Sequence, residues 1–250
     1  MTTLLLLRHG RTPANTAGVL AGWTPGVELD EKGRAQAAAV AERLLKVPLA
    51  AVVTSPLDRC RQTAAAVLDR RDSGDAVVDD RLGECRYGDW TGQKISKLAK
   101  DPMWAVVQQH PSAAVFPGPE GEALAATQAR AVAAVRDWNA RLGPDATWLA
   151  CTHGDVIKAI VADALGMHLD LFQRITADPC SITAIRYTPT RPFLLFGNDS
   201  GGDLAALLTP PPAAKEPAAK KKPGGKAAKN PKQALDPSDA VLGGGAGHAP

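Results

Sequence analysis

Residues 2–12 read TTLLLLRHGRT, and within this stretch an apolar run is followed directly by charged and polar residues, which is the strongest indication of the fold. Residues 2–7 form a short, largely apolar run, which is typical of a strand buried on both faces of a parallel sheet. Arg8, His9 and Gly10 follow at once, so two polar side chains stand where the strand ends. In open α/β sheets, ligands bind beyond the carboxyl ends of the strands. The stretch therefore predicts an α/β protein with a ligand site beside His9.

The remainder of residues 1–203 alternates between strand-like and helix-like segments. Further strands are predicted at residues 50–54, 76–79, 147–152, 181–187 and 193–196, the last two joined by a turn around Pro189. Helices are predicted at residues 31–46, with Asp30 as the cap, and also at 56–71, 120–142 and 155–165. Such alternation implies a three-layer α/β sandwich, in which a mostly parallel sheet is covered by helices on both faces.

Two regions depart from this alternation and suggest the domain organisation. Residues 87–119 contain scattered Gly and Pro with Trp90, Trp104 and Phe116, and we expect a cap insertion of helices and loops over one end of the sheet. Loops on a rigid scaffold are where substrate selectivity tends to lie, although these aromatic residues fit core packing equally well. Residues 204–250 are rich in Ala, Lys, Pro and Gly. They are predicted to form a disordered tail, because they offer too little apolar surface to offset the entropy of ordering.

The charge of the chain is unevenly distributed. The net charge is +3, but residues 204–250 hold seven Lys and three acidic residues, which leaves 22 basic and 23 acidic residues elsewhere. The predicted domain at 1–203 is therefore not basic, and no nucleic-acid partner is expected. No apolar run approaches the ~20 residues that cross a bilayer, so no membrane association is expected. The run at 4–7 is also too short for a signal peptide, which predicts a cytoplasmic protein.

The cysteines do not suggest a metal site. Cys60, Cys85, Cys151 and Cys180 form no CxxC pair and have no regular spacing, whereas a zinc site usually brings two ligands close in sequence. Reduced thiols are the expected state in a cytoplasmic protein of this size.

Charged and nucleophilic side chains follow several of the predicted strands. Such residues occur in LLLLRHGRT, TSPLDRCRQTA, RLGECRYGDWTG and WLACTHGD, and they are Arg8, His9, Arg59, Glu84 and His153. Arginine forks match phosphate oxygens and stay charged at any working pH. A neutral imidazole can attack phosphorus, and a protonated carboxyl can protect a leaving alkoxide. Convergence of these residues on one rim predicts a site for a phosphate monoester.

The same four motifs, in this order and at these separations, resemble the histidine phosphatase superfamily, in its phosphoglycerate mutase-like branch. The resemblance extends from about Thr2 to Tyr187. It implies that His9 is the nucleophile that becomes phosphohistidine and that Glu84 is the proton donor. It also implies phosphoryl contacts from Arg8, Arg59 and His153, with further polar contacts from Asn15 and the amide of Gly154. No cofactor and no metal are expected, because the arginines and His153 supply the positive field.

Three functions are compatible with these residues. The first is a metal-independent phosphatase acting on a small phosphorylated metabolite, and the second is a phosphomutase that returns the phosphoryl group to its substrate. The third is a non-catalytic protein that binds a phosphorylated ligand, although such a protein has no reason to keep both a nucleophile and an acid. Lys94, Lys97 and Lys100 recur at roughly helical spacing, which favours a solvated face over a clamp for a second phosphate. Glu122 adds negative charge that a bisphosphate would not favour, so we expect hydrolysis. The sequence does not predict the substrate or the oligomeric state.

Overall fold

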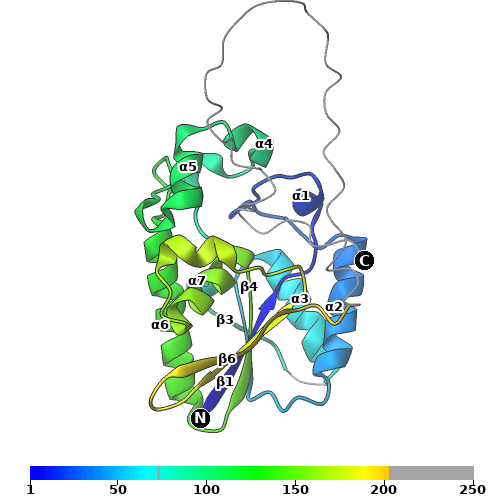
Figure 1. Ribbon diagram of the computed structural model, residues 1–250. Coiled ribbons are helices and arrows are strands. Elements are labelled where there is room, and N and C mark those ends of the chain that lie inside the picture. Colours follow the sequence, from blue (N-terminus) through cyan, green and yellow to red (C-terminus); the bar gives the residue numbers. More distant parts are fainter. Residues whose placement is uncertain (72–73, 203–250) are drawn as a thin grey trace, which may run out of the picture.

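The computed structural model describes residues 1–71 and 74–202 (Figure 1). The predicted tail at 204–250 lies outside these residues. The strands are β1 (Thr2–Arg8), β2 (Ala51–Thr54), β3 (Val77–Val78), β4 (Thr147–Thr152), β5 (Ile182–Tyr187) and β6 (Pro192–Asp199). The α-helices are α1 (Pro13–Thr16), α2 (Glu31–Leu44), α3 (Asp58–Asp69), α4 (Ile95–Leu98), α5 (Pro102–Gln109), α6 (Leu124–Leu142) and α7 (Gly154–Ala164). Short 3₁₀ turns are η1 (Asp80–Leu82), η2 (Gly88–Trp90), η3 (Pro111–Ala113) and η4 (Leu169–Arg174).

The strands form one sheet in the order β3-β2-β4-β1-β5-β6. The pairs β1–β4, β2–β4 and β2–β3 are parallel, and β5 runs antiparallel to both β1 and β6. Only β5 therefore runs against the other strands of this sheet. The predicted hairpin of the last two strands is confirmed, and its turn is closed by a hydrogen bond from the Thr188 amide to the Arg191 carbonyl.

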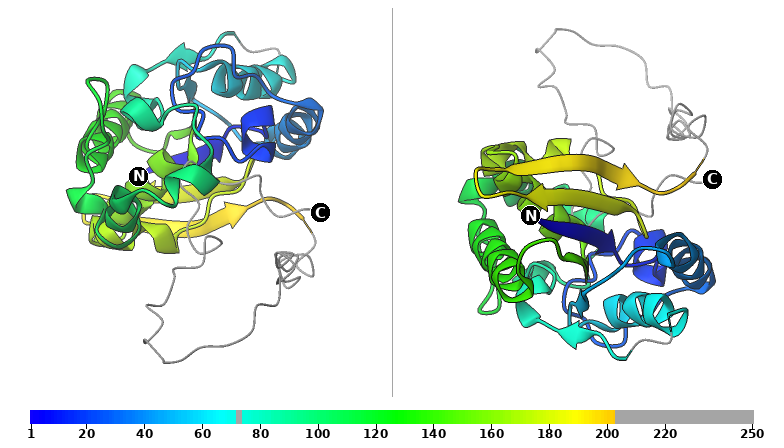
Figure 2. Two further views of the ribbon diagram at one scale, coloured as in Figure 1. Left: turned by 90° about the horizontal axis from the view of Figure 1, so that it is seen from above. Right: turned by 90° about the horizontal axis from the view of Figure 1, so that it is seen from below.

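Helices cover both faces of the sheet, as predicted, because alternate side chains of its central strands enter two separate cores. On one side, Leu5 and Leu7 of β1 pack with residues of α2 and α3. On the other side, Leu4 and Leu6 pack with residues of α6 and α7. Figure 2 shows the α2–α3 pair and α6 on opposite sides of the strands. None of the helices within the described ranges combines the length and the apolar character needed to cross a bilayer.

The segment at 87–119 lies at the end of the molecule toward which β1 points (Figure 1). It contains η2, α4, α5 and η3, and it contributes to a third apolar core. Trp90, Trp104 and Phe116 are nearly fully buried in this core, where the Trp90 and Phe116 rings lie 5.5 Å apart. Of the two interpretations of these aromatic residues, core packing is the one that the structure supports.

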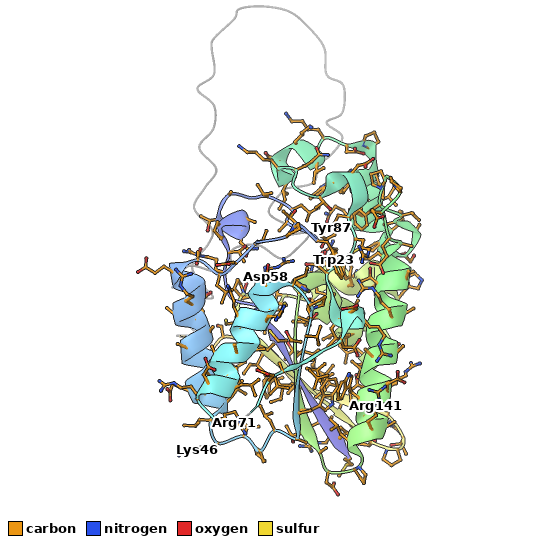
Figure 3. All side chains as sticks on the ribbon, turned by 180° about the vertical axis from the view of Figure 1, so that it is seen from behind. Trp23, Lys46, Asp58, Arg71, Tyr87 and Arg141 are labelled. Atoms are coloured by element: carbon orange, nitrogen blue, oxygen red, sulfur yellow. The ribbon has the colours of Figure 1, made fainter. Side chains whose placement is uncertain are left out.

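Several helix boundaries differ from the prediction for identifiable reasons. α3 begins at Asp58 rather than at Pro56, because Leu57 is its extended cap residue and its carbonyl accepts the first helical hydrogen bonds. α6 begins at Leu124 rather than at 120, because residues 121–123 form bridges to the chain before the helix. α2 ends at Leu44 rather than at 46, where the Arg71 guanidinium donates to the carbonyls of Leu44, Leu45 and Val47. Figure 3 shows Arg71 beside Lys46 at this end of the molecule.

Candidate active site

His9 follows β1 directly and is 2% exposed. Its Nδ1 lies 2.8 Å from the carbonyl oxygen of Gly10. A carbonyl can only accept, so Nδ1 carries the proton and the lone pair of the neutral ring lies on Nε2. Burial, aided by the charges of Arg59 and Arg8, holds the pKa of His9 well below its ordinary value. The ring is therefore neutral at physiological pH, with Nε2 available as a nucleophile.

The position of His9 depends on a close approach between two backbones. A Cβ at Gly10 would lie 2.6 Å from the carbonyl oxygen of Gly33, and a Cβ at Gly33 would lie 2.0 Å from the carbonyl oxygen of Arg11. Real side-chain atoms are not tolerated at such distances, so both positions require glycine. The first turn of α2 consequently packs directly against the chain that carries His9.

Arg59 lies in the first turn of α3 and is 3% exposed. Its Nε donates to Nε2 of His9 at 3.3 Å, and its Nη2 donates to the Gly22 carbonyl at 2.9 Å and to Nδ1 of His153 at 3.3 Å. One guanidinium thus connects both histidines.

His153 follows β4 and is fully buried. Because its Nδ1 accepts from the positively charged Arg59, its proton lies on Nε2, which is 2.8 Å from Oγ of Ser55. Burial and the charge of Arg59 lower the pKa of His153 well below its ordinary value. The rings of His9 and His153 are 5.2 Å apart and meet edge to face. Both imidazoles therefore have tautomers fixed by their neighbours.

Glu84 belongs to the loop between η1 and η2 and is 2% exposed. Its Oε1 accepts from the Cys85 amide at 3.0 Å, and its Oε2 lies 3.7 Å from Nδ1 of His153. Burial, aided by the negative charge of Asp155, raises the pKa of Glu84 to about 7. A substantial fraction of this carboxyl group is therefore protonated at neutral pH and can act as an acid.

The remaining residues implicated by the sequence surround this group less closely. Arg8 is fully buried at the end of β1 and donates to the Ala177 carbonyl at 2.7 Å. Gly154 is the first residue of α7, where backbone amides face outward from the helix end. Asn15 lies in α1, where its Oδ1 accepts from the amide and hydroxyl of Thr12. An anion contact from Asn15 would therefore involve its amide nitrogen rather than its oxygen.

A buried polar network behind Glu84 is not apparent from the sequence. Asp155 is fully buried, accepts from the hydroxyl of Tyr87 at 2.7 Å, and pairs with Lys158 at 3.3 Å. Lys158 also donates to Oε1 of Gln173 at 2.8 Å. Figure 3 labels Tyr87 below the helices α4 and α5. The THGD motif gives the one sequence signal for this network, since its acidic residue falls in a strongly apolar helix.

The geometry brings five of the sequence candidates to the carboxyl end of the parallel strands. The candidate functional atoms are Nε2 of His9, Nδ1 of His153, Oε2 of Glu84 and the guanidinium groups of Arg59 and Arg8. Such a set offers a nucleophile, an acid and fixed positive charge for an anionic group. Across residues 1–71 and 74–202, no group of three or more His, Cys, Asp or Glu side chains is arranged to hold a metal ion.

Comparison with known proteins identifies the family. Residues 4–200 match the model of the histidine phosphatase superfamily, branch 1. A relative named 2,3-bisphosphoglycerate-dependent phosphoglycerate mutase 2, from Gloeobacter violaceus, is 29% identical over 75% of this chain and 86% of its own length. A glucosyl-3-phosphoglycerate phosphatase from Mycolicibacterium vanbaalenii is 33% identical over 67% of this chain and 76% of its own.

A solved structure gives the same result in three dimensions. The structure of Bacillus stearothermophilus YhfR matches with a TM-score of 0.72 at 32% identity, covering 80% of this chain and 98% of that one. The fold, the order of the motifs and the family match agree along the described chain. The protein therefore belongs to branch 1 of the histidine phosphatase superfamily, whose members similar to it include both phosphatases and phosphoglycerate mutases.

Proposed function

We propose that this protein is a phosphatase that hydrolyses a small phosphomonoester through a phosphohistidine at His9. The observation that carries the proposal is the convergence of two imidazoles, a guanidinium and a carboxyl group in one buried site. Nε2 of a neutral His9 faces a guanidinium, and a carboxyl whose pKa is raised to about 7 lies beside His153. Nucleophile and acid are thus in their reactive states at the same pH.

The first step transfers the phosphoryl group to the enzyme. Nε2 of His9 forms a bond to phosphorus while the ester P–O bond breaks, and Glu84 gives its proton to the leaving alkoxide. Arg8 and Arg59 stabilise the charge that spreads over the phosphoryl oxygens, aided by Asn15 and the amide of Gly154. His153 contributes once its Nδ1 carries a proton and donates it to a phosphoryl oxygen in place of accepting from Arg59. The positive field in this proposal comes from protein side chains, without a metal ion or another cofactor.

The second step returns the enzyme to its starting state. Water attacks phosphorus, the N–P bond breaks, and the carboxylate of Glu84 accepts the proton of the water. Inorganic phosphate then leaves, with Glu84 again protonated and His9 again neutral. The same carboxyl group therefore acts first as acid and then as base.

Hydrolysis is favoured over return of the phosphoryl group to the substrate, because the cations of and beside the segment at 87–119 are not arranged as a clamp for a second anionic group. Lys94, Lys97 and Lys100 are exposed, as a solvated face would be. Arg86 pairs with Glu120 at 3.5 Å and lies over the Trp23 ring. We propose that residues 87–119 form a cap that admits one phosphate group of a small metabolite. Phosphomutase activity is the second candidate, because one similar relative carries that name.

The charge of Glu122 gives weaker support for hydrolysis than the sequence suggests. Its carboxylate is held by Arg130 at 2.7 Å, so its negative charge is largely compensated.

We place the protein in the cytoplasm, which is supported by four buried cysteines without disulfides in the described chain.

The test compares hydrolysis with isomerisation. Purified protein is incubated with 3-phosphoglycerate, with and without 2,3-bisphosphoglycerate, while 2-phosphoglycerate and free phosphate are followed. A parallel assay uses p-nitrophenyl phosphate in the presence of EDTA. The proposal predicts phosphate release in both assays, with little 2-phosphoglycerate formed. Isomerisation much faster than phosphate release would identify a mutase, and the absence of any turnover on a wider phosphate-ester panel would favour a binding protein.

A further inference from the structure

The loop that carries Glu84 is fixed by the side chain of Arg130, which projects from α6. Nη1 of Arg130 donates to the carbonyls of Arg81 at 2.7 Å and Gly83 at 2.8 Å. Nη2 donates to the carbonyl of Glu84 at 2.9 Å. Trp23 adds a hydrogen bond from Nε1 to the same Glu84 carbonyl at 2.6 Å. These carbonyls lie outside any strand or α-helix, so side chains supply partners that a regular element would otherwise provide.

Arg130 is itself held in one orientation by Glu122. Nε of Arg130 donates to Oε1 of Glu122 at 2.7 Å, and Nη2 donates to Oε2 at 3.0 Å. Oε2 also accepts from the amide of Arg86 at 3.1 Å. Burial raises the pKa of Glu122, but the hydrogen bonds and charge of Arg130 outweigh it and hold this pKa below its ordinary value. A two-point contact between a carboxylate and a guanidinium fixes the plane of both groups. Glu122 therefore determines where the five N–H donors of Arg130 point.

We propose that Arg130, oriented by Glu122, is a positioning residue that holds Glu84 at the distance required for proton transfer to the leaving group. The inference rests on the proposed role of Glu84 as the acid. Arg130 bonds to the carbonyls of Arg81 and Gly83, which precede Glu84, and to the carbonyl of Glu84 itself, so the Cα from which the carboxyl projects is tightly constrained. A displacement of about 1 Å in a reacting group can cost roughly 10²-fold in rate.

A positioning role predicts a loss that depends on the leaving group. An alkoxide needs the proton from Glu84, whereas p-nitrophenolate scarcely does. Arg130→Lys keeps the charge but cannot bond three carbonyls and a carboxylate at once, and Glu122→Gln keeps the shape but weakens the two-point contact. We expect Arg130→Lys to lower kcat for an alkyl phosphate by about tenfold or more, and to change kcat for p-nitrophenyl phosphate by less than about threefold. Glu122→Gln should show the same selectivity with smaller losses.

The experiment measures both substrates for both variants, alone and combined with Glu84→Gln. In the Glu84→Gln background, neither change should add a further selective loss, because the acid is already missing. Arg136→Lys is the matched control, since Arg136 is an exposed arginine of the same helix. Circular dichroism and thermal unfolding report whether each variant folds, and Glu122→Gln provides the test if Arg130→Lys does not fold.

The outcomes separate the inference from the function on which it rests. A selective loss for Glu84→Gln with an equal loss on both substrates for Arg130→Lys and Glu122→Gln would overturn positioning while leaving the acid role intact. Selective losses that add fully to that of Glu84→Gln would also overturn it. Equal losses on both substrates for Glu84→Gln itself would remove the acid role and the inference together.

Discussion

Burial acts in opposite directions on the two kinds of titratable side chain at this site. It lowers the pKa of His9 and of His153, and it raises the pKa of Glu84 to about 7. An imidazole that would otherwise be partly charged is kept neutral, and a carboxyl group that would otherwise be ionised is partly protonated at neutral pH, as the proposed roles of nucleophile and acid require. The charges of Arg59 and Arg8 strengthen the effect on His9 and oppose it at Glu84. Burial thus favours the protonation state that the proposed mechanism needs at both His9 and Glu84.

Asp155 provides a residue-scale test of this electrostatic arrangement. Its negative charge raises the pKa of Glu84, so Asp155→Asn should lower that pKa and leave the nearby ammonium of Lys158 without its carboxylate. The basic limb of the kcat/KM profile for an alkyl phosphate should then move to lower pH. Activity at pH 7.5 should fall by up to about tenfold for each unit of that shift. Asp163→Asn, on an exposed part of α7, is the control. A basic limb that stays in place in Asp155→Asn would show that Asp155 does not set the acidity of Glu84.

At the scale of elements, the packing of α2 against the His9 segment is the most demanding contact. Alanine is intrinsically favoured over glycine in a helix by about 1 kcal/mol, so Gly33→Ala would stabilise an isolated α2. In the folded protein the new Cβ would lie 2.0 Å from the Arg11 carbonyl oxygen. We therefore expect a net loss of about 1–3 kcal/mol in the free energy of unfolding, together with a lower kcat.

Urea unfolding and turnover of p-nitrophenyl phosphate measure the two effects of Gly33→Ala. Gly197→Ala is the matched control, because a Cβ at Gly197 meets no heavy atom within 4 Å. A Gly33→Ala protein as stable and as active as the wild type would mean that α2 does not fix the position of His9.

The elements also show how far sequence reasoning extends. The strand at 2–7 and the residues after it could be predicted, because an apolar run that ends in RHG has a local signature. The hairpin at the end of the sheet can also be predicted from its local pattern. The antiparallel pairing of β5 with β1 is a tertiary contact, and it has no local signature in the sequence. The contact of Arg130 with the loop of Glu84 cannot be predicted for the same reason, since its three carbonyl partners lie 46 to 49 residues away in the chain. The sequence likewise does not reveal that the charge of Glu122 is compensated, because nothing distinguishes its partner Arg130 from the other arginines of predicted helices.

For the molecule as a whole, the buried histidines predict how stability depends on pH. Their folded-state pKa values lie well below 6.5, so below that pH the unfolded chain takes up protons that the folded chain does not. Each histidine then costs about 1.4 kcal/mol of unfolding free energy per pH unit. Glu84 acts oppositely, because its raised pKa favours the folded state as the pH falls from about 7 to 4.5. Because two histidines oppose one glutamate, these three groups together lower the free energy of unfolding as the pH falls.

Comparison of His9→Asn with the wild type isolates one of these contributions. Between pH 7 and 5.5 the variant should lose about 1 kcal/mol less unfolding free energy than the wild type, as measured by urea titration at each pH. If acidification costs His9→Asn as much as the wild type, His9 is not held neutral by the fold.

Detection of the covalent intermediate is the most direct test of catalysis through His9. A substrate with a labelled phosphoryl group is mixed with enzyme, the reaction is quenched at alkaline pH within the first turnover, and the labelled peptide is identified by mass spectrometry. If His9 becomes phosphohistidine, we expect an acid-labile, base-stable phosphoryl group on the peptide that contains His9. We expect no such label in His9→Ala, together with a loss of activity of about 10³-fold or more. A fully active His9→Ala protein, or a wild-type label on any residue other than His9, would show that the reaction does not pass through phosphohistidine at His9.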